Sequence, residues 1–238
     1  MTAPLILACD TTQGACSVAL YHDGVLAEKS SPMRKGHAEA LIPMMEAVMN
    51  EAGLAMTDID RLAVTNGPGT FTGTRVGLSA MRALSLALKK PLKAYGSLEV
   101  MAQAVGDDTP VLVAVDARRD VFYSQGFEAQ AHNGTRAALG APQALSAAAA
   151  LELMGGGAFG LIGTGAPALA AGATALGLAA HVSDAPDWPE ARFVAQMAAR
   201  DDEWESPPLP SPFYLRPPDA TLPNRDKFPA RAPSHAKS

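Results

Sequence analysis

A pattern of short apolar segments around one acidic residue occurs twice in this chain and restricts the folds it can adopt. In the first copy Asp10 ends an apolar run, and the Asp23-Gly24 pair further along is a strong signal for a tight hairpin turn. In the second copy Asp116 ends a similar run. Two antiparallel meanders predict a duplicated α/β fold with two lobes. The strand-like runs are 5–8, 16–21 and 25–30 in the first copy, and 111–116 and 121–127 in the second.

Two long segments with helical periodicity carry more apolar surface than one sheet can cover. They span 36–52 and 74–89, and each leaves only a narrow polar stripe. Pro43 lies inside the first segment, where it predicts either a kink or a helix that effectively begins near it. The surplus apolar surface requires burial against another part of the chain or against a partner subunit, because exposed it would favour aggregation.

The stretch GPGTFTGTR, which precedes the second helical segment, allows two interpretations. A glycine-rich turn at a helix N-terminus can bind phosphate through backbone amides. Alternatively, Gly67 and Gly69 permit the turn, Gly73 allows a close approach, and Thr72 or Thr74 caps the helix. The spacing fits neither the Walker loop nor G-x-G-x-x-G, so the pattern favours the second interpretation.

The two acidic residues at the ends of strand-like runs are candidate phosphate-handling groups. Asp10 occupies the place where acetate and sugar kinases and other actin-like ATPases have a phosphate- or metal-handling acid. Thr11 and Thr12 follow it, instead of the glycine that lets a backbone approach phosphate closely. Asp116 is the matching acid, but the tripeptide Ala-Arg-Arg replaces the glycine pair of a second phosphate loop. Both acids can therefore cap turns instead.

The sequence gives little indication of a metal site or of a hydrolase active site. His37 opens the first helical segment, but a helical zinc site requires a second histidine four residues later, where Leu41 stands. Neither G-x-S-x-G nor a catalytic cysteine frame is present. Cys9 and Cys16 are too far apart for C-x-x-C chemistry, and we expect both to pack as small hydrophobic residues. We therefore expect no metal site and no catalytic residue.

The composition is that of a globular protein without a broad basic face. Of the 238 residues, 48% are hydrophobic, which is enough for a core, and the formal net charge at pH 7 is -5. A negatively charged chain does not hold nucleic acid strongly, so we expect a partner to supply most of any RNA contact. The N-terminus lacks the basic segment of a secretory signal, and no apolar run is long enough to span a bilayer. The expected location is the cytoplasm, without membrane contact.

Three sequence blocks in a fixed order resemble the TsaB family. They are LACDTTQGACSVAL, KGHAEALIP and GPGTFTGTRVGL. The later blocks VDARRDVFY and PFYLR are also similar, so the resemblance extends to about residue 218. It implies an α/β fold of the actin-like (ASKHA, ribonuclease H-like) class, with two lobes and a duplicated βββαβα-type core.

TsaB proteins are non-catalytic partners of TsaD, which transfers a threonylcarbamoyl group to the adenosine next to the anticodon of tRNAs reading ANN codons. The resemblance implies that this chain binds and activates TsaD, that the ATPase TsaE joins the complex, and that the chain forms a homodimer when alone. It implies no cofactor of the chain's own, because partner subunits handle ATP and metal and the complex provides the contact with tRNA.

Two enzymatic alternatives remain open at this point. The first is an actin-like ATPase or kinase that uses Asp10 and the loop at 67–75 on its own. The second is a metallopeptidase, which the missing second histidine disfavours.

The expected organisation has an N-terminal lobe at 1–106 with the dimerisation helices, a C-terminal lobe at 107–218 whose closing segment can return to the first lobe, and a flexible tail at 219–238. Ile42 and Met49 are expected in the protein's own core. The residues expected at the partner interface are Leu41, Met44, Met45, Val48, Arg75, Val76, Met81 and Leu84. The residues expected to set loop geometry, or to remain from a phosphate loop, are Asp10, Thr11, Gly67, Gly69 and Gly73.

Overall fold

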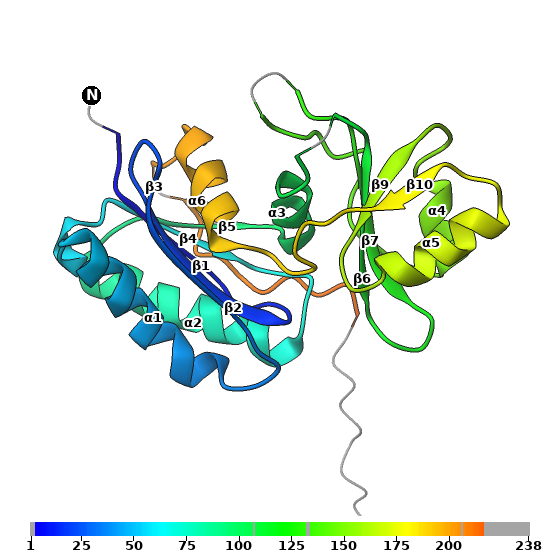
Figure 1. Ribbon diagram of the computed structural model, residues 1–238. Coiled ribbons are helices and arrows are strands. Elements are labelled where there is room, and N and C mark those ends of the chain that lie inside the picture. The colour runs from blue at the N-terminus through cyan, green and yellow to red at the C-terminus, as the bar shows by residue number, and fades with distance from the viewer. Residues whose placement is uncertain (1–2, 107, 132–133, 206, 217–238) are drawn as a thin grey trace, which may run out of the picture.

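The computed structural model describes residues 3–106, 108–131, 134–205 and 207–216, which form two lobes around two five-stranded sheets (Figure 1). The strands of the first sheet are β1 (Ile6–Asp10), β2 (Ala15–Tyr21), β3 (Val25–Pro32), β4 (Arg61–Thr65) and β5 (Leu92–Tyr95). Those of the second are β6 (Val111–Asp116), β7 (Phe122–Phe127), β8 (Gln143–Leu145), β9 (Phe159–Ile162) and β10 (Ala180–Val182).

The two sheets have the same topology. The order is β3-β2-β1-β4-β5 in the first sheet and, read from the matching edge, β8-β7-β6-β9-β10 in the second. In each sheet the first three strands pair antiparallel, and the remaining two pairings are parallel. The predicted duplicated, actin-like α/β fold with two lobes is confirmed. The predicted bounds of the lobes along the chain stay a prediction, and the predicted tail at 219–238 lies outside the described residues.

The helices cover both faces of each sheet. On one face of the first sheet lie α1 (His37–Ala52) and α2 (Phe71–Leu88), with a short 3-10 turn, η1 (Met56–Asp58), after α1. On one face of the second lie α4 (Ala147–Glu152) and α5 (Ala166–Ala175). The remaining two helices are α3 (Ser97–Gln103) and α6 (Ala191–Arg200).

The helices α3 and α6 are exchanged between the two halves of the chain. α3 follows β5 in the sequence but packs on the second sheet, whereas α6 ends the second half and packs on the first sheet. The two helices contact each other and lie on the sides of the sheets that face one another (Figure 1). The exchange ties the lobes together through two buried helix faces.

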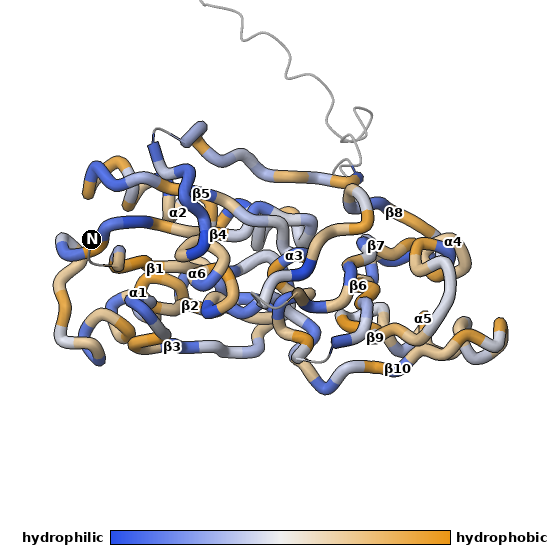
Figure 2. Tube along the Cα trace, turned by 90° about the horizontal axis from the view of Figure 1, so that it is seen from above, coloured by the Kyte–Doolittle hydropathy of each residue, from blue (hydrophilic) through white to orange (hydrophobic). Residues whose placement is uncertain are grey.

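The alternation of side chains along β1 explains why both faces of its sheet are buried. Leu7 and Cys9 point into the core under α1 and α2, whereas Ile6 and Ala8 point towards α6. Successive strand residues face opposite sides of a sheet. Hydrophobic residues accordingly occupy nearly all of β1, and the hydropathy colouring in Figure 2 shows such apolar strands inside both lobes.

The structure fixes where the two predicted helices begin. Each begins before the residue that one sequence signal, Pro43 in the first and the predicted threonine cap in the second, indicates as its start. α1 begins at His37 and continues through Pro43, so the expectation that it starts near the proline is wrong. α2 begins at Phe71 because the Thr70 side chain accepts a hydrogen bond from the Gly73 amide at 3.1 Å. Thr70 is therefore the N-cap in place of the predicted Thr72 or Thr74, and the first turn of α2 lies within the glycine-rich stretch.

Candidate functional site

The loop after β1 and the glycine-rich loop before α2 are bonded directly to each other. The Thr70 amide donates to the Thr12 carbonyl at 2.7 Å. The Thr11 hydroxyl donates to the Gly73 carbonyl at 2.7 Å and accepts from the Gly77 amide at 2.9 Å. Two backbone amides at this loop and in α2, those of Thr70 and Gly77, are therefore engaged by Thr12 and Thr11.

The glycines of this loop stand where a side chain would collide with neighbouring backbone. A Cβ at Gly69 would overlap the Thr12 carbonyl, and one at Gly73 would overlap the Thr11 carbonyl. Gly67 has a φ of +109°, and a Cβ there would lie 2.5 Å from the Phe213 carbonyl oxygen. These contacts fix the spacing between the two loops and the position at which α2 begins.

The Asp10 carboxyl is fully buried and bonded by neighbouring threonines. Its Oδ1 accepts hydrogen bonds from the Thr12 amide at 3.2 Å, from the Thr12 hydroxyl at 2.6 Å, and from the Thr65 hydroxyl. Its Oδ2 has no hydrogen-bond partner among the described residues. Burial raises the pKa of Asp10 from 3.8 to about 6, and the bonds from Thr12 and Thr65 oppose that rise. Asp10 therefore holds the ends of β1 and β4 together.

The matching turn of the second lobe is filled by side-chain-bearing residues. The Asp116 carboxylate accepts a hydrogen bond from the Arg118 amide at 2.7 Å, which closes the turn. Arg118, Arg119 and Asp120 have φ values of 66°, 57° and 55°. These left-handed conformations are ones that glycine adopts most readily. The turn thus has the backbone shape of a glycine turn but offers arginines where a phosphate loop would offer bare amides.

Metal-binding and membrane-spanning features do not occur in the part of the chain that the structure describes. His37 lies with its Nε2 3.1 Å from the Gln13 carbonyl oxygen, so this ring joins α1 to the loop after β1. No group of three or more His, Cys, Asp or Glu side chains within those residues is placed to hold a metal ion. None of the described helices is both long enough and apolar enough to cross a membrane.

An apolar groove lies between the outer surfaces of α1 and α2. Its volume is about 430 Å³. Ile42 on α1 and Phe71 on α2 are 48% and 41% exposed beside it. The lining residues are Ala38, Leu41, Ile42, Phe71, Thr72, Arg75, Val76, Ser79 and Ala80.

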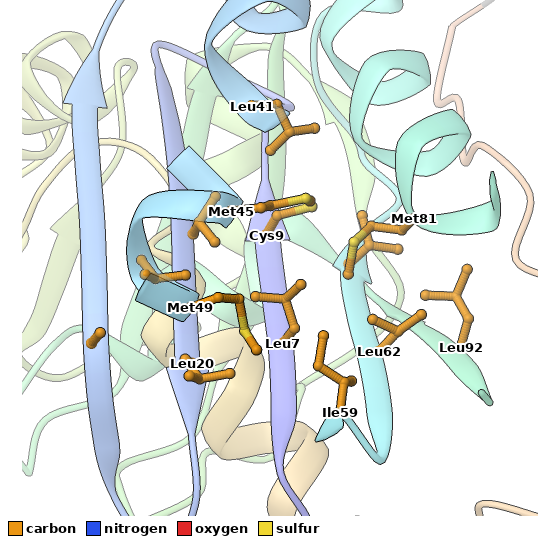
Figure 3. Close-up of a cluster of buried hydrophobic side chains, with 14 of the residues drawn as sticks. Leu7, Cys9, Leu20, Leu41, Met45, Met49, Ile59, Leu62, Met81 and Leu92 are labelled. Carbon is orange, nitrogen blue, oxygen red and sulfur yellow. The ribbon is translucent and has the colours of Figure 1, made fainter. Parts of the chain in front are cut away.

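Four of the predicted interface residues belong to the core of the first lobe. Leu41, Met45, Val48 and Met81 are at most 1% exposed and pack with Leu7, Cys9, Leu20 and Leu62 (Figure 3). Burial leaves Met45, Val48 and Met81 almost no surface for a partner, whereas Leu41 also lines the groove. That these residues form an interface stays a prediction. Met49 lies in the core as expected, whereas Ile42 is exposed and the expectation that it is buried is wrong.

The composition of α1 explains why the sequence did not show which of its residues are buried. α1 is apolar around most of its circumference, so periodicity alone could not identify which apolar stripe faces the sheet. Of the other predicted interface residues, Met44, Val76 and Leu84 are half-buried and Arg75 is exposed. The sequence reasoning did not place Ala38, Phe71, Thr72, Ser79 or Ala80 at the interface. Recognising Thr70 as the N-cap would have placed Phe71 on the helix.

The fold and these loops define the class of protein. It is a two-lobed, actin-like protein whose two acidic turns are closed by its own threonines and arginines. Its first lobe carries an open apolar groove between two helices. A family model described as TsaD, tRNA N6-adenosine threonylcarbamoyltransferase, matches residues 12–170, which is more than half of the chain. The chain belongs to the family that this model describes, and within it to the TsaB proteins.

Similar proteins support this assignment. The chain is 37% identical over 121 residues to the tRNA threonylcarbamoyladenosine biosynthesis protein TsaB of Escherichia coli, and 34% identical over 122 residues to that of Bacillus subtilis. Each alignment covers 50% of this chain, and 52% and 53% of the relative, so the chain spans about half the length of the curated relatives it matches.

Solved structures cover more of the chain. A crystal structure from Pseudomonas aeruginosa, described as an uncharacterized protein with similarity to peptidase YEAZ, has a TM-score of 0.72 and 30% identity. It covers 90% of this chain and 100% of that one. The structure of YeaZ from the same species has a TM-score of 0.67 and 28% identity, covering 82% and 90% respectively.

Proposed function

We propose that this chain is a non-catalytic subunit that binds TsaD and activates it for threonylcarbamoyl transfer to the adenosine next to the anticodon of tRNAs reading ANN codons. The observation that carries the proposal is the apolar groove between α1 and α2. Its lining joins Ile42 and Phe71 to Leu41 and Val76 in one contiguous apolar patch, and such a patch marks an interaction site. Such side chains are expected where a second protein covers them.

The groove suits a partner that presents helices. Its walls are the outer surfaces of two neighbouring helices. The lining includes Ala38 and Ala80, whose small side chains protrude little into the groove. Small residues between two helices let the backbone of a third helix approach closely, and the helix ridges of a partner pack into such grooves. A homologous pair of helices on TsaD would complete a four-helix contact, and the same surface on a second copy would account for a homodimer when TsaD is absent.

The closed acidic loops support the non-catalytic part of the proposal. Asp10 is bonded to threonines, and Thr11 and Thr12 are bonded to the Gly73 carbonyl and the Thr70 amide of the glycine-rich loop. In this proposal ATP and metal belong to TsaD and TsaE, tRNA is reached through the complex, and the complex works in the cytoplasm. The chain has no cofactor of its own.

Association with TsaD of the same organism tests the proposal. The purified proteins are mixed and separated by size-exclusion chromatography, with and without TsaE and ATP. We expect a stoichiometric complex with the natural chain and none with Ile42→Asp, which introduces a charge into the groove. Leu176→Asp is the matched control, because Leu176 is 61% exposed on the second lobe, away from the groove.

Two results would contradict the proposal. One is separate elution of the two natural proteins under every condition. The other is equal loss of association in Ile42→Asp and Leu176→Asp, since only the former changes the groove. An ATPase or kinase that acts alone would instead bind Mg-ATP tightly in calorimetric titration, with the binding lost in Asp10→Ala.

A further inference from the structure

An arginine held against two aromatic rings stands at one side of the groove. Arg75 Cζ lies 3.4 Å from the centroid of the Phe71 ring and 5.6 Å from that of Tyr214. The two rings stack on each other with their centroids 5.5 Å apart and an interplanar angle of 28°. Phe71 and Arg75 line the groove, and Arg75 is exposed. The guanidinium therefore has a defined position at the edge of an apolar surface.

Tyr214 comes from the closing segment of the chain, defined here as Ser211–Arg216. This segment is fixed to the loop before α2, because the Phe213 amide donates to the Asn66 carbonyl at 2.8 Å and the Asn66 side chain donates to the Ser211 carbonyl at 3.3 Å. At its end, Arg216 donates to the Ala117 carbonyl of the second lobe at 3.3 Å. In Figure 2 the segment crosses from the first lobe towards the second. The more distant of the two rings beside Arg75 is thus supplied by an anchored segment.

The positive charge of Arg75 is not balanced by an ion pair within the described residues. The ion pairs at the first sheet lie elsewhere and include Lys29–Glu51, Lys90–Asp60, Lys93–Asp201 and Arg192–Glu28. Arginine stacked on aromatic faces keeps its in-plane N–H groups available, and this planar fork matches a carboxylate in a bidentate arrangement. Covering the groove would also remove water from the guanidinium, and a desolvated charge requires a partner of opposite sign.

We propose that Arg75, positioned by Phe71 and Tyr214, is the charged anchor of the groove and pairs with a carboxylate side chain of the docking partner. The inference rests on the proposed function and adds the chemistry of the contact: the helix that fills the groove carries an Asp or Glu facing Arg75. It also gives the closing segment a part in docking, since Tyr214 limits the positions that the guanidinium can take before the partner arrives. Preorganisation of this kind lowers the entropy cost of association.

The phenol oxygen of Tyr214 provides a matched control. Tyr214 Oη is buried and has no hydrogen-bond partner among the residues that the structure describes. The contribution of this side chain to Arg75 is therefore its ring face. Tyr214→Phe keeps that face and should bind like the natural chain, whereas Tyr214→Leu removes the aromatic support and should bind several-fold more weakly.

The test measures the Kd for TsaD by calorimetry at several NaCl concentrations. We expect Arg75→Gln to bind at least tenfold more weakly and to show a flatter dependence of affinity on salt, because one ion pair is lost. Arg82→Gln removes another exposed arginine of α2 that lies outside the groove lining, and should leave both quantities unchanged. Thermal unfolding of each variant shows whether it is folded.

The inference is overturned if folded Arg75→Gln keeps the natural affinity and salt dependence, or if Tyr214→Phe and Tyr214→Leu lose affinity equally. These outcomes differ from a failure of the proposed function. If the natural chain binds TsaD and Ile42→Asp does not, the groove is the docking surface whatever Arg75 does. If the natural chain does not bind, the proposed function itself fails. A charge exchange identifies the acidic partner of Arg75. Asp and Glu residues of TsaD are replaced with Lys one at a time, and one of these TsaD variants should bind the Arg75→Glu chain more tightly than it binds the natural chain.

Discussion

Replacing Asp10 with asparagine should reduce the dependence of stability on pH. The carboxyl is fully buried, and its pKa is raised from 3.8 to about 6, chiefly by burial. Because the folded state holds its proton at a higher pH than the unfolded state does, stability falls as pH rises through this window and is constant above it. The raised pKa corresponds to a cost of roughly 3 kcal/mol for the ionised carboxylate at neutral pH.

The comparison between two pH values isolates this cost. Asparagine at position 10 puts an amide where Oδ2 now has no partner, and a buried donor without a partner costs about 1–3 kcal/mol at every pH. The difference in unfolding free energy between Asp10→Asn and the natural chain therefore changes with pH only through the carboxyl. Between pH 4.5 and pH 8 it should shift by about 2 kcal/mol in favour of the variant.

Urea unfolding followed by circular dichroism at pH 4.5, 5.5, 6.5 and 8 measures the difference. Other titrating groups are the same in both proteins, so their effects cancel. Two curves that run parallel across this range would refute the reasoning, because they would mean that Asp10 has the same pKa in the folded and unfolded chains. A shift in favour of the natural chain would show that the hydrogen bonds from the threonines outweigh burial.

Three further predictions concern the loops and the core. Gly69→Val should lower the free energy of unfolding by about 3 kcal/mol or more, because the Cβ of the introduced valine would overlap the Thr12 carbonyl. Association with TsaD should fall in parallel, and an unchanged melting temperature would contradict the close contact. Arg136→Met should lower the free energy of unfolding in urea by roughly 2–4 kcal/mol, because the guanidinium donates to three backbone carbonyls. A decrease smaller than the error of the assay would show that water takes over the hydrogen bonds of the guanidinium. Burial raises the pKa of Cys9, and raises that of Cys16 to about 12, so neither thiol should react with iodoacetamide until urea unfolds the chain; mass spectrometry of the native protein showing either alkylated would disprove this.

The sequence predicted the sheets better than the surfaces of the helices. The run at 111–116 coincides with β6, and the first three strands lie within two residues of their predicted ends, because alternating or continuous apolar runs between turn residues are strong signals. β5 and β10 have four and three residues and lie at sheet edges, where too few side chains are buried to make a pattern.

The candidate site was predictable in its loops and only partly in its groove. Asp10, Thr11 and the three glycines were singled out because their residue types and order have a direct backbone meaning. The groove depended on which side of α1 faces the sheet, and apolar residues all round that helix made the choice ambiguous. Tyr214 could not be linked to Arg75 at all, since the contact joins residues 139 positions apart through an extended segment without periodicity.

The hydrogen bonds between the loop after β1 and α2 also hold one wall of the groove in place. Thr11 bonds the Gly73 carbonyl and the Gly77 amide, so the first two turns of α2 are attached to the end of β1. The glycine-rich loop is closed from one side by Thr11 and from the other by the closing segment at Gly67. In the proposed complex, α2 would meet its partner with its angle already set, and a rigid surface loses less entropy on association than a mobile one. The hydrogen bonds that close this loop are therefore the same ones that position the proposed docking surface.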